Sequence, residues 1–191
     1  YYSQGRYAEA EPLYLQALEM KKRLLGQEHP DVASSLNNLA YLYDSQGRYA
    51  EAEPLYLQAL ELRKRLLGQE HPDVAQSLNN LANLYYSQGR YAEAEPLYLQ
   101  TVEMRKRLLG EEHRSVALSL NNLANLYYSQ GRYAEAEPLY LQALEIAQRQ
   151  LGANHPRTIT FCENLQALRE QRKPWFIKAM ASMRRFFFIG D

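Results

Sequence analysis

Hydrophobic residues along the chain recur at the three- and four-residue spacing that is typical of amphipathic helices. One such run lies at Val32, Leu36, Leu39, Ala40, Leu42 and Tyr43, and a second follows between Tyr49 and Leu67. Pro30 suits a first helical turn, whereas Gly47 and Gly68 suit helix ends. The pattern predicts helices over residues 7–25, 31–46, 49–67, 73–88, 91–109, 115–130, 133–151 and 157–171.

The same pattern repeats with a period of 42 residues. The segment QGRYAEAEPLYLQ begins at Gln4, Gln46, Gln88 and Gln130, and residues 7–48 match residues 49–90 at 37 of 42 positions. Neither helix of a unit can bury its apolar face alone, so neighbouring units must stack. We predict one array over residues 1–172. It comprises a partial unit (1–25), full units at about 30–67, 72–109 and 114–151, and a degenerate terminal helix (156–172).

Residues 173–191 depart from the repeat and predict an amphipathic C-terminal helix. Its apolar positions follow helical spacing at Trp175, Phe176, Ala179, Met180, Met183 and Phe187. Three roles remain open for this tail: it covers the last repeat, fills a groove, or lies on an anionic membrane through Lys178, Arg184 and Arg185. Capping is the favoured role, because Leu165 and Leu168 need a cover.

Composition and charge exclude several classes of function. The 22 basic and 22 acidic residues cancel, which argues against a general nucleic-acid binder. No run of 18 apolar residues predicts a membrane span, and no leader segment is expected. Cys162 is the one cysteine in the sequence, so no internal disulfide is predicted and a cytoplasmic location is the expectation.

The repeat resembles a known family at the spacing Leu36-x-x-Leu39-Ala40-x-x-Tyr43, followed by Ala52-x-x-x-Tyr56 and Ala59. This spacing is similar to the tetratricopeptide repeat signature, and the 42-residue form with LGxEHPDVAxSLNNLAxLY resembles the repeats of kinesin light chains and their bacterial relatives. The resemblance implies an all-α fold, namely a right-handed α-solenoid of stacked antiparallel helix pairs. It also implies a concave groove, lined by the first helix of each unit, that binds an extended peptide.

The resemblance places a row of asparagine and tyrosine side chains in that groove. The expected groove residues are Asn37, Asn38 and Tyr41, then Asn79, Asn80, Asn83 and Tyr86, then Asn121, Asn122, Asn125 and Tyr128, and finally Asn164. Asparagine is a poor helix former but offers both a donor and an acceptor to a peptide backbone. The alternative is that these are ordinary solvated residues. We expect alanine at Asn80 and Asn122 to weaken peptide binding without harm to folding.

The function expected from these features is a non-enzymatic scaffold that binds a peptide segment of a partner protein. The alternative is a structural module that stacks end to end without a groove ligand. A homodimer through the N-terminal helix or the tail is a further expectation. The residues predict no catalytic site and no cofactor.

Three further groups of residues are predicted to have structural roles. The histidines His29, His71, His113 and His155 lie one repeat apart, which predicts a role at helix starts and no metal site. Cys162 replaces a core leucine and is predicted to be buried and inert. The basic turns at Lys21–Arg23, Arg63–Arg65 and Arg105–Arg107 predict a solvated edge, with docking of an acidic partner as the alternative.

Overall fold

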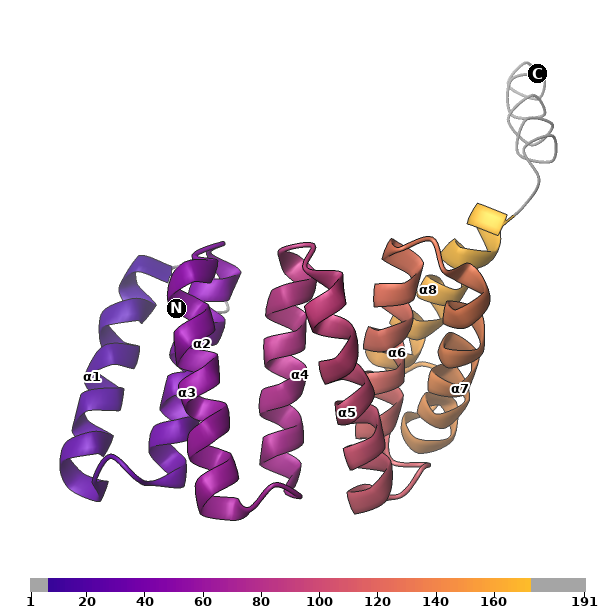
Figure 1. Ribbon diagram of the computed structural model, residues 1–191. Coiled ribbons are helices and arrows are strands. Elements are labelled where there is room, and N and C mark those ends of the chain that lie inside the picture. The colour runs from indigo at the N-terminus through magenta and orange to yellow at the C-terminus, as the bar shows by residue number, and fades with distance from the viewer. Residues whose placement is uncertain (1–6, 173–191) are drawn as a thin grey trace.

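The computed structural model describes residues 7–172, which form α-helices joined by short turns (Figure 1). The helices are α1 (Tyr7–Leu25), α2 (Pro30–Ser45), α3 (Tyr49–Leu67), α4 (Pro72–Ser87), α5 (Tyr91–Leu109), α6 (Arg114–Ser129), α7 (Tyr133–Leu151) and α8 (Pro156–Arg172). Four of the predicted helices have these bounds, and the other four begin one residue earlier than predicted. The predicted helix of the tail lies outside the described residues.

The helices form a stacked array of antiparallel pairs. We call α2, α4, α6 and α8 the A helices, and α1, α3, α5 and α7 the B helices. Each of α2, α4 and α6 packs most extensively on the B helix that follows it and less extensively on the B helix before it, and consecutive A helices also touch. Figure 1 shows the pairs in order along the array from α1 to α8. The predicted all-α solenoid is therefore confirmed.

A histidine stands directly before each A helix and acts as its N-cap. The Nδ1 atom of His71 accepts a hydrogen bond from the backbone N–H of Asp73 at 3.1 Å. The same contact recurs at His29, His113 and His155. It satisfies an N–H group that has no partner within the helix, which explains why a side chain with an acceptor recurs there. The predicted role at helix starts is confirmed.

A glycine turn reverses the chain between each A helix and its B helix. Gly89 has a φ of 72°, a conformation that glycine adopts without steric cost. The backbone N–H of the next residue, Arg90, donates to the carbonyl of Tyr85 at 2.9 Å and closes the end of α4. The turn is short enough to hold the two helices of a unit antiparallel.

The core runs continuously along the array between the A and B helices. In each full unit a B-helix tyrosine lies at its centre, namely Tyr56, Tyr98 and Tyr140, each at most 2% exposed. Alanine, leucine and valine of both helix types surround these rings. No unit has a separate core, so stability is shared between neighbours.

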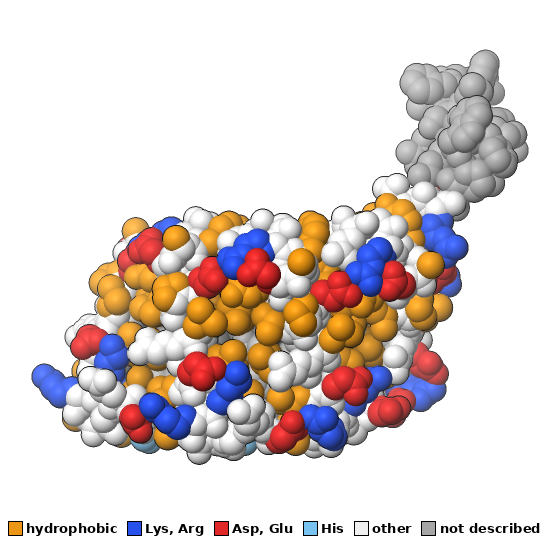
Figure 2. Space-filling model, in the orientation of Figure 1, with side chains coloured by type: hydrophobic (Ala, Val, Ile, Leu, Met, Phe, Trp, Pro, Cys, Tyr) orange, Lys and Arg blue, Asp and Glu red, His pale blue; other side chains and the backbone are white. Residues whose placement is uncertain are grey.

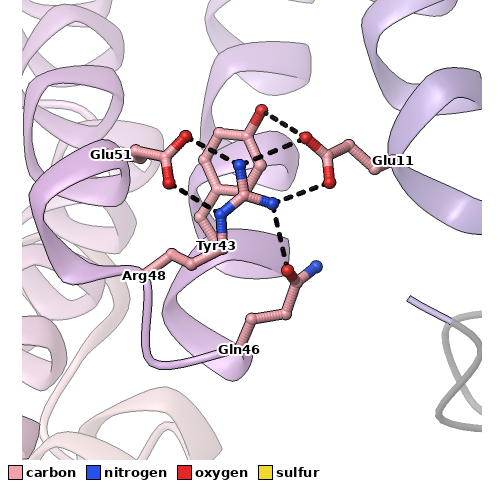
Figure 3. Close-up of polar contacts among 5 residues, drawn as sticks. All are labelled: Glu11, Tyr43, Gln46, Arg48 and Glu51. Carbon is pink, nitrogen blue, oxygen red and sulfur yellow. Dashed lines mark hydrogen bonds and ion pairs between the residues drawn. The ribbon is translucent and has the colours of Figure 1, made fainter. Parts of the chain in front are cut away.

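A polar cluster also joins consecutive units (Figure 3). Arg48 lies in the turn after α2, where it bonds Glu11 of α1 and Glu51 of α3, each at 2.7 Å. Its guanidinium stacks 4.1 Å from the ring centre of Tyr43, whose hydroxyl also donates to Glu11. The hydrogen bond from Arg48 lowers the pKa of the Glu11 carboxyl. The same cluster recurs around Arg90 and Arg132.

The cluster is modified at the last unit. There Glu137 of α7 pairs with Arg169 and Arg172 of α8. Arg169 stands at the position of Tyr43, and it still provides the preceding glutamate with a partner. The outer face of α8 is polar, and Cys162 on it is half-buried, so the prediction of a buried cysteine is wrong. The leucine position it occupies is covered in the other units by a following B helix, which α8 lacks among the described residues.

Candidate functional site

The exposed face of the A helices forms one stripe of uncharged side chains. Four positions in each A helix, spaced by three or four residues, are exposed or half-buried. The A stripe comprises Ser34, Asn38, Tyr41 and Ser45 on α2, Gln76, Asn80, Asn83 and Ser87 on α4, Leu118, Asn122, Asn125 and Ser129 on α6, and Thr160, Asn164, Ala167 and Gln171 on α8. All but Leu118 and Ala167 carry an amide or a hydroxyl group. The surface therefore offers hydrogen bonds and no charge of its own.

Charged side chains gather along the edges of the array. On the face shown in Figure 2, acidic and basic side chains alternate in two rows, close to the ends of the helices in Figure 1. One set of pairs links neighbouring units at their exposed connectors: Arg65 with Glu28, Arg107 with Glu70, and Arg149 with Glu112, at 2.6–3.0 Å. The basic turns thus find acidic partners on the neighbouring connector, which favours a solvated edge over a docking strip for an acidic partner.

The first asparagine of each predicted pair is a structural residue. Asn37, Asn79 and Asn121 are 9%, 3% and 4% exposed. Each accepts a hydrogen bond through Oδ1 from the second asparagine of the following unit, at 2.8, 3.1 and 2.9 Å. Consecutive A helices are therefore linked by amide–amide bonds that lie beneath the A stripe. Direct contact of these three side chains with a ligand would require that the helices separate.

The second asparagine of each pair lies on the A stripe, between the buried asparagines and the surface. One N–H of Asn122 donates to Asn79, which leaves its other N–H and its carbonyl oxygen toward the surface. Asn80 and Asn164 make the same inward bond. The oxygen of Asn80 also accepts from Gln76 at 2.7 Å. Asn38 is exposed, and its amide has no hydrogen-bond partner within residues 7–172.

The third predicted position differs between units. Asn83 and Asn125 accept hydrogen bonds from the hydroxyls of the buried tyrosines Tyr98 and Tyr140, at 2.7 and 2.6 Å. Burial raises the pKa of both tyrosine hydroxyls, so they remain protonated donors. Tyr41 replaces asparagine at this position on α2 and is 51% exposed. The stripe therefore presents an aromatic ring near one end and amides further along.

The fourth predicted position carries tyrosine on α4 and α6. The ring centres of Tyr86 and Tyr91 lie 5.7 Å apart, and those of Tyr128 and Tyr133 lie 5.5 Å apart. The Tyr86 hydroxyl and the Ser129 Oγ form a hydrogen bond of 2.9 Å between units. The corresponding residue on α2 is Asp44. Of the predicted groove residues, the structure thus places all but the three buried asparagines at the surface of the A helices.

Sequence reasoning missed two arginines that the array buries. Arg63 and Arg105 belong to the predicted basic edge, yet they are 7% and 4% exposed. Arg105 donates to the Ser115 carbonyl, the Ser119 hydroxyl and the Gln76 side chain, at 2.8–3.1 Å. Burial lowers the pKa of Arg105 to about 10. A signal was present in the sequence, because serine recurs 14 residues after each of these arginines.

The chain matches the family model described as "Tetratricopeptide repeat" over residues 1–65, 42–107, 73–149 and 115–165. BtubC (BKLC) from P. vanneervenii is 32% identical with a TM-score of 0.76, and the match covers 88% of this chain and 67% of that one. A putative kinesin light chain with nearly identical TPR-like repeats from Podosopora anserina is 30% identical. Its TM-score is 0.72, with 89% of this chain and 82% of that chain covered.

Two further similarities are weaker, one in sequence identity and the other in the length that it covers. The apo form of RapI has a TM-score of 0.75 at 16% identity, with 90% of this chain and 60% of that chain covered, so it shows the fold alone. A nucleotide-binding leucine-rich repeat (NLR)-like protein from Hyaloscypha variabilis is 54% identical over 37 residues. Those residues are 19% of this chain and 4% of that protein, so the chain matches only a small part of its length.

Proposed function

The chain belongs to the tetratricopeptide repeat family, in its kinesin-light-chain-like form, and from this premise we propose that the A stripe binds an extended peptide segment of a partner protein. Tetratricopeptide repeats generally serve as scaffolds for protein interactions, and no catalytic family is indicated by the match. Peptide binding along the A helices is the finer function that we assign to this scaffold.

The observation that carries the proposal is the repeated amide on the A stripe. The second asparagines recur once in each A helix, and packed helices lie roughly 8–10 Å apart. An extended chain advances about 3.3 Å per residue, so one asparagine corresponds to about three peptide residues. Each amide can meet either a peptide N–H or a carbonyl without selecting the peptide side chain. For Asn80, Asn122 and Asn164, the inward bond to the buried asparagine holds the amide in place before a ligand arrives.

Replacing Asn38 with alanine should weaken peptide binding by about 1 kcal/mol, or roughly fivefold, because one backbone contact is lost. Asn38 makes no hydrogen bond within residues 7–172, so the melting temperature should not fall. The matched control is Gln58→Ala, which removes an exposed amide from the B helix α3. Peptides selected from a random display library on the full chain serve as probes, and fluorescence anisotropy measures their affinity.

Two outcomes of this experiment would contradict the proposal. Failure to select any peptide would argue against a peptide site on this protein. Equal losses for Asn38→Ala and Gln58→Ala would argue that the selected peptides do not use the A stripe. A loss confined to Asn38→Ala, with an unchanged melting temperature, supports the proposed site.

A second function, self-association, is favoured by one specific surface on α1. Leu13, Met20 and Leu24 are 50%, 47% and 69% exposed. In α3, which has almost the same sequence, Leu62 stands at the position of Met20 and is 5% exposed, because α2 and α4 pack on that helix. Contiguous exposed apolar side chains favour association. We propose that this face of α1 meets the same face of a second copy.

The double variant Met20→Glu and Leu24→Glu should shift the protein from dimer to monomer at high micromolar concentration, because the charges would be desolvated in the contact. Light scattering gives the molar mass. Leu57→Glu and Leu99→Glu, on exposed positions of α3 and α5, form the matched control and should leave the mass unchanged. A wild-type protein that is monomeric throughout this range would contradict the proposal.

A further inference from the structure

The end of helix α2 lacks a contact that the end of helix α4 makes. On α4, the Tyr86 ring packs against the Tyr91 ring at a tilt of 41°, and the Tyr86 hydroxyl forms a hydrogen bond with Ser129 of the next unit. The residue at the same position on α2 is Asp44, and the serine one unit further along is Ser87. The Asp44 carboxylate makes no hydrogen bond to Ser87, since its side chain is much shorter than that of tyrosine. The ring that fills this place beside α4 is therefore missing beside α2.

The Asp44 side chain has no cationic partner among residues 7–172. Tyr49, which corresponds to Tyr91, has no ring partner among residues 7–172. No ion pair or hydrogen bond to the Asp44 side chain occurs in that range either. Arg48, the basic residue nearest in sequence, is held by Glu11 and Glu51. Asp44 is half-buried, and burial raises the pKa of its carboxyl group without an opposing positive charge.

A carboxylate in this setting favours a cationic ligand. Partial burial weakens its hydration, and a positive partner would restore the lost interaction. The unpaired ring of Tyr49 offers a face for a cation, which adds to the ion pair. Tyr98 lies close enough for Asp44 to act on the pKa of its hydroxyl, and that hydroxyl is engaged with Asn83. An acidic ligand group would meet an uncompensated negative charge here.

We propose that Asp44, together with the ring of Tyr49 at the position that corresponds to Tyr91, forms a subsite for a lysine or arginine side chain of the bound peptide. The basic side chain would occupy the place at the end of α2 that the Tyr86 ring fills at the end of α4. This inference rests on the proposed peptide-binding function and assigns it a side-chain preference. The A stripe itself is uncharged, so a charged subsite next to it would select the charge of the peptide and fix the register of the peptide along the helices.

The test is a random peptide display selection on the full chain and on three variants. Peptides selected on the wild type should share a lysine or arginine at one position, and replacing that residue with leucine should weaken binding about tenfold. Asp44→Asn should remove the preference at nearly constant shape. Asp44→Tyr should fill the subsite with a ring on Tyr49 and a hydroxyl near Ser87, and should also exclude the basic side chain.

The reciprocal variant, Tyr86→Asp, keeps the inference falsifiable if Asp44→Tyr folds poorly. It should create a second basic preference about three peptide residues from the first, one unit along the array. Selected peptides without a basic position, or a preference that survives Asp44→Asn, would overturn the subsite and leave the peptide-binding function standing. A selection that yields no peptide at all would overturn both.

Discussion

Replacing Arg105 with alanine is expected to lower the free energy of unfolding by about 3 kcal/mol. The side chain is 4% exposed, and its guanidinium bonds groups from both neighbouring A helices: Gln76 of α4, and Ser115 and Ser119 of α6. Removing it would take a donor away from the buried Ser119 hydroxyl and the half-buried Ser115 carbonyl, and it would open a cavity between the helices. Because each unit is stabilised by its neighbours, the loss should appear in the urea unfolding of the whole chain.

The corresponding contact one unit further along, where α7 packs between α6 and α8, shows how the loss can be repaired. There Ala147 stands at the position of Arg105, while Leu118 and Phe161 stand at the positions of Gln76 and Ser119. Ala147 and Phe161 are both buried. The polar set of one junction is thus replaced by an apolar set of similar total volume at the next. Well-packed apolar groups can replace a buried charge without loss of stability.

The triple variant Arg105→Ala, Gln76→Leu and Ser119→Phe should therefore regain most of the stability that the single variant loses. Urea midpoints of the wild type, the single variant and the triple variant make the comparison. The exposed arginine two residues away supplies a control, since Arg107→Ala should have little effect. A single variant as stable as the wild type, or a triple variant no better than the single one, would contradict this account of the junction.

The fold could be predicted almost completely from the sequence, because the information it needs is local. Apolar spacing gives the helices, glycine gives the turns, and the period of 42 residues gives the stacking. The four A helices begin one residue earlier than predicted because the histidine before each helix acts as the N-cap, which places the next residue inside the helix. A cap of this kind depends on side-chain geometry that periodicity does not encode.

The surface could be predicted less well, because burial depends on contacts between units. Asn37 and Asn38 are adjacent and identical, yet one is buried and the other is exposed. Arg63 and Arg65 differ in the same way within one basic turn. A helical residue turns by about 100° from its neighbour, so runs of like residues divide between the interior and the surface. The sequence alone does not show where the next helix will pack.

Asn122→Ala is expected to lower the free energy of unfolding by about 2 kcal/mol, contrary to the sequence-based expectation that alanine would be harmless. Alanine is the better helix former, by several tenths of a kcal/mol. That gain is smaller than the cost of leaving the Oδ1 of Asn79, which is 3% exposed, without its donor. Asn38→Ala should not share this loss, because Asn38 has no inward bond among the described residues. Thermal melting of the two variants gives the comparison.

A double-mutant cycle can assign this loss to the bond between the asparagines. Asn79→Ala removes the buried acceptor, and Asn79→Ala with Asn122→Ala removes both partners. If the bond links the units, the double variant should be more stable than the sum of the single losses predicts, by about 1 kcal/mol. Additive losses would mean that the two amides act independently and that the ladder does not couple the A helices. Peptide affinity should be measured on the same variants well below their melting temperatures. Asn79→Ala removes only the buried partner, whereas Asn122→Ala also removes the amide on the A stripe. A larger loss of affinity for Asn122→Ala than for Asn79→Ala would therefore report the surface role of Asn122.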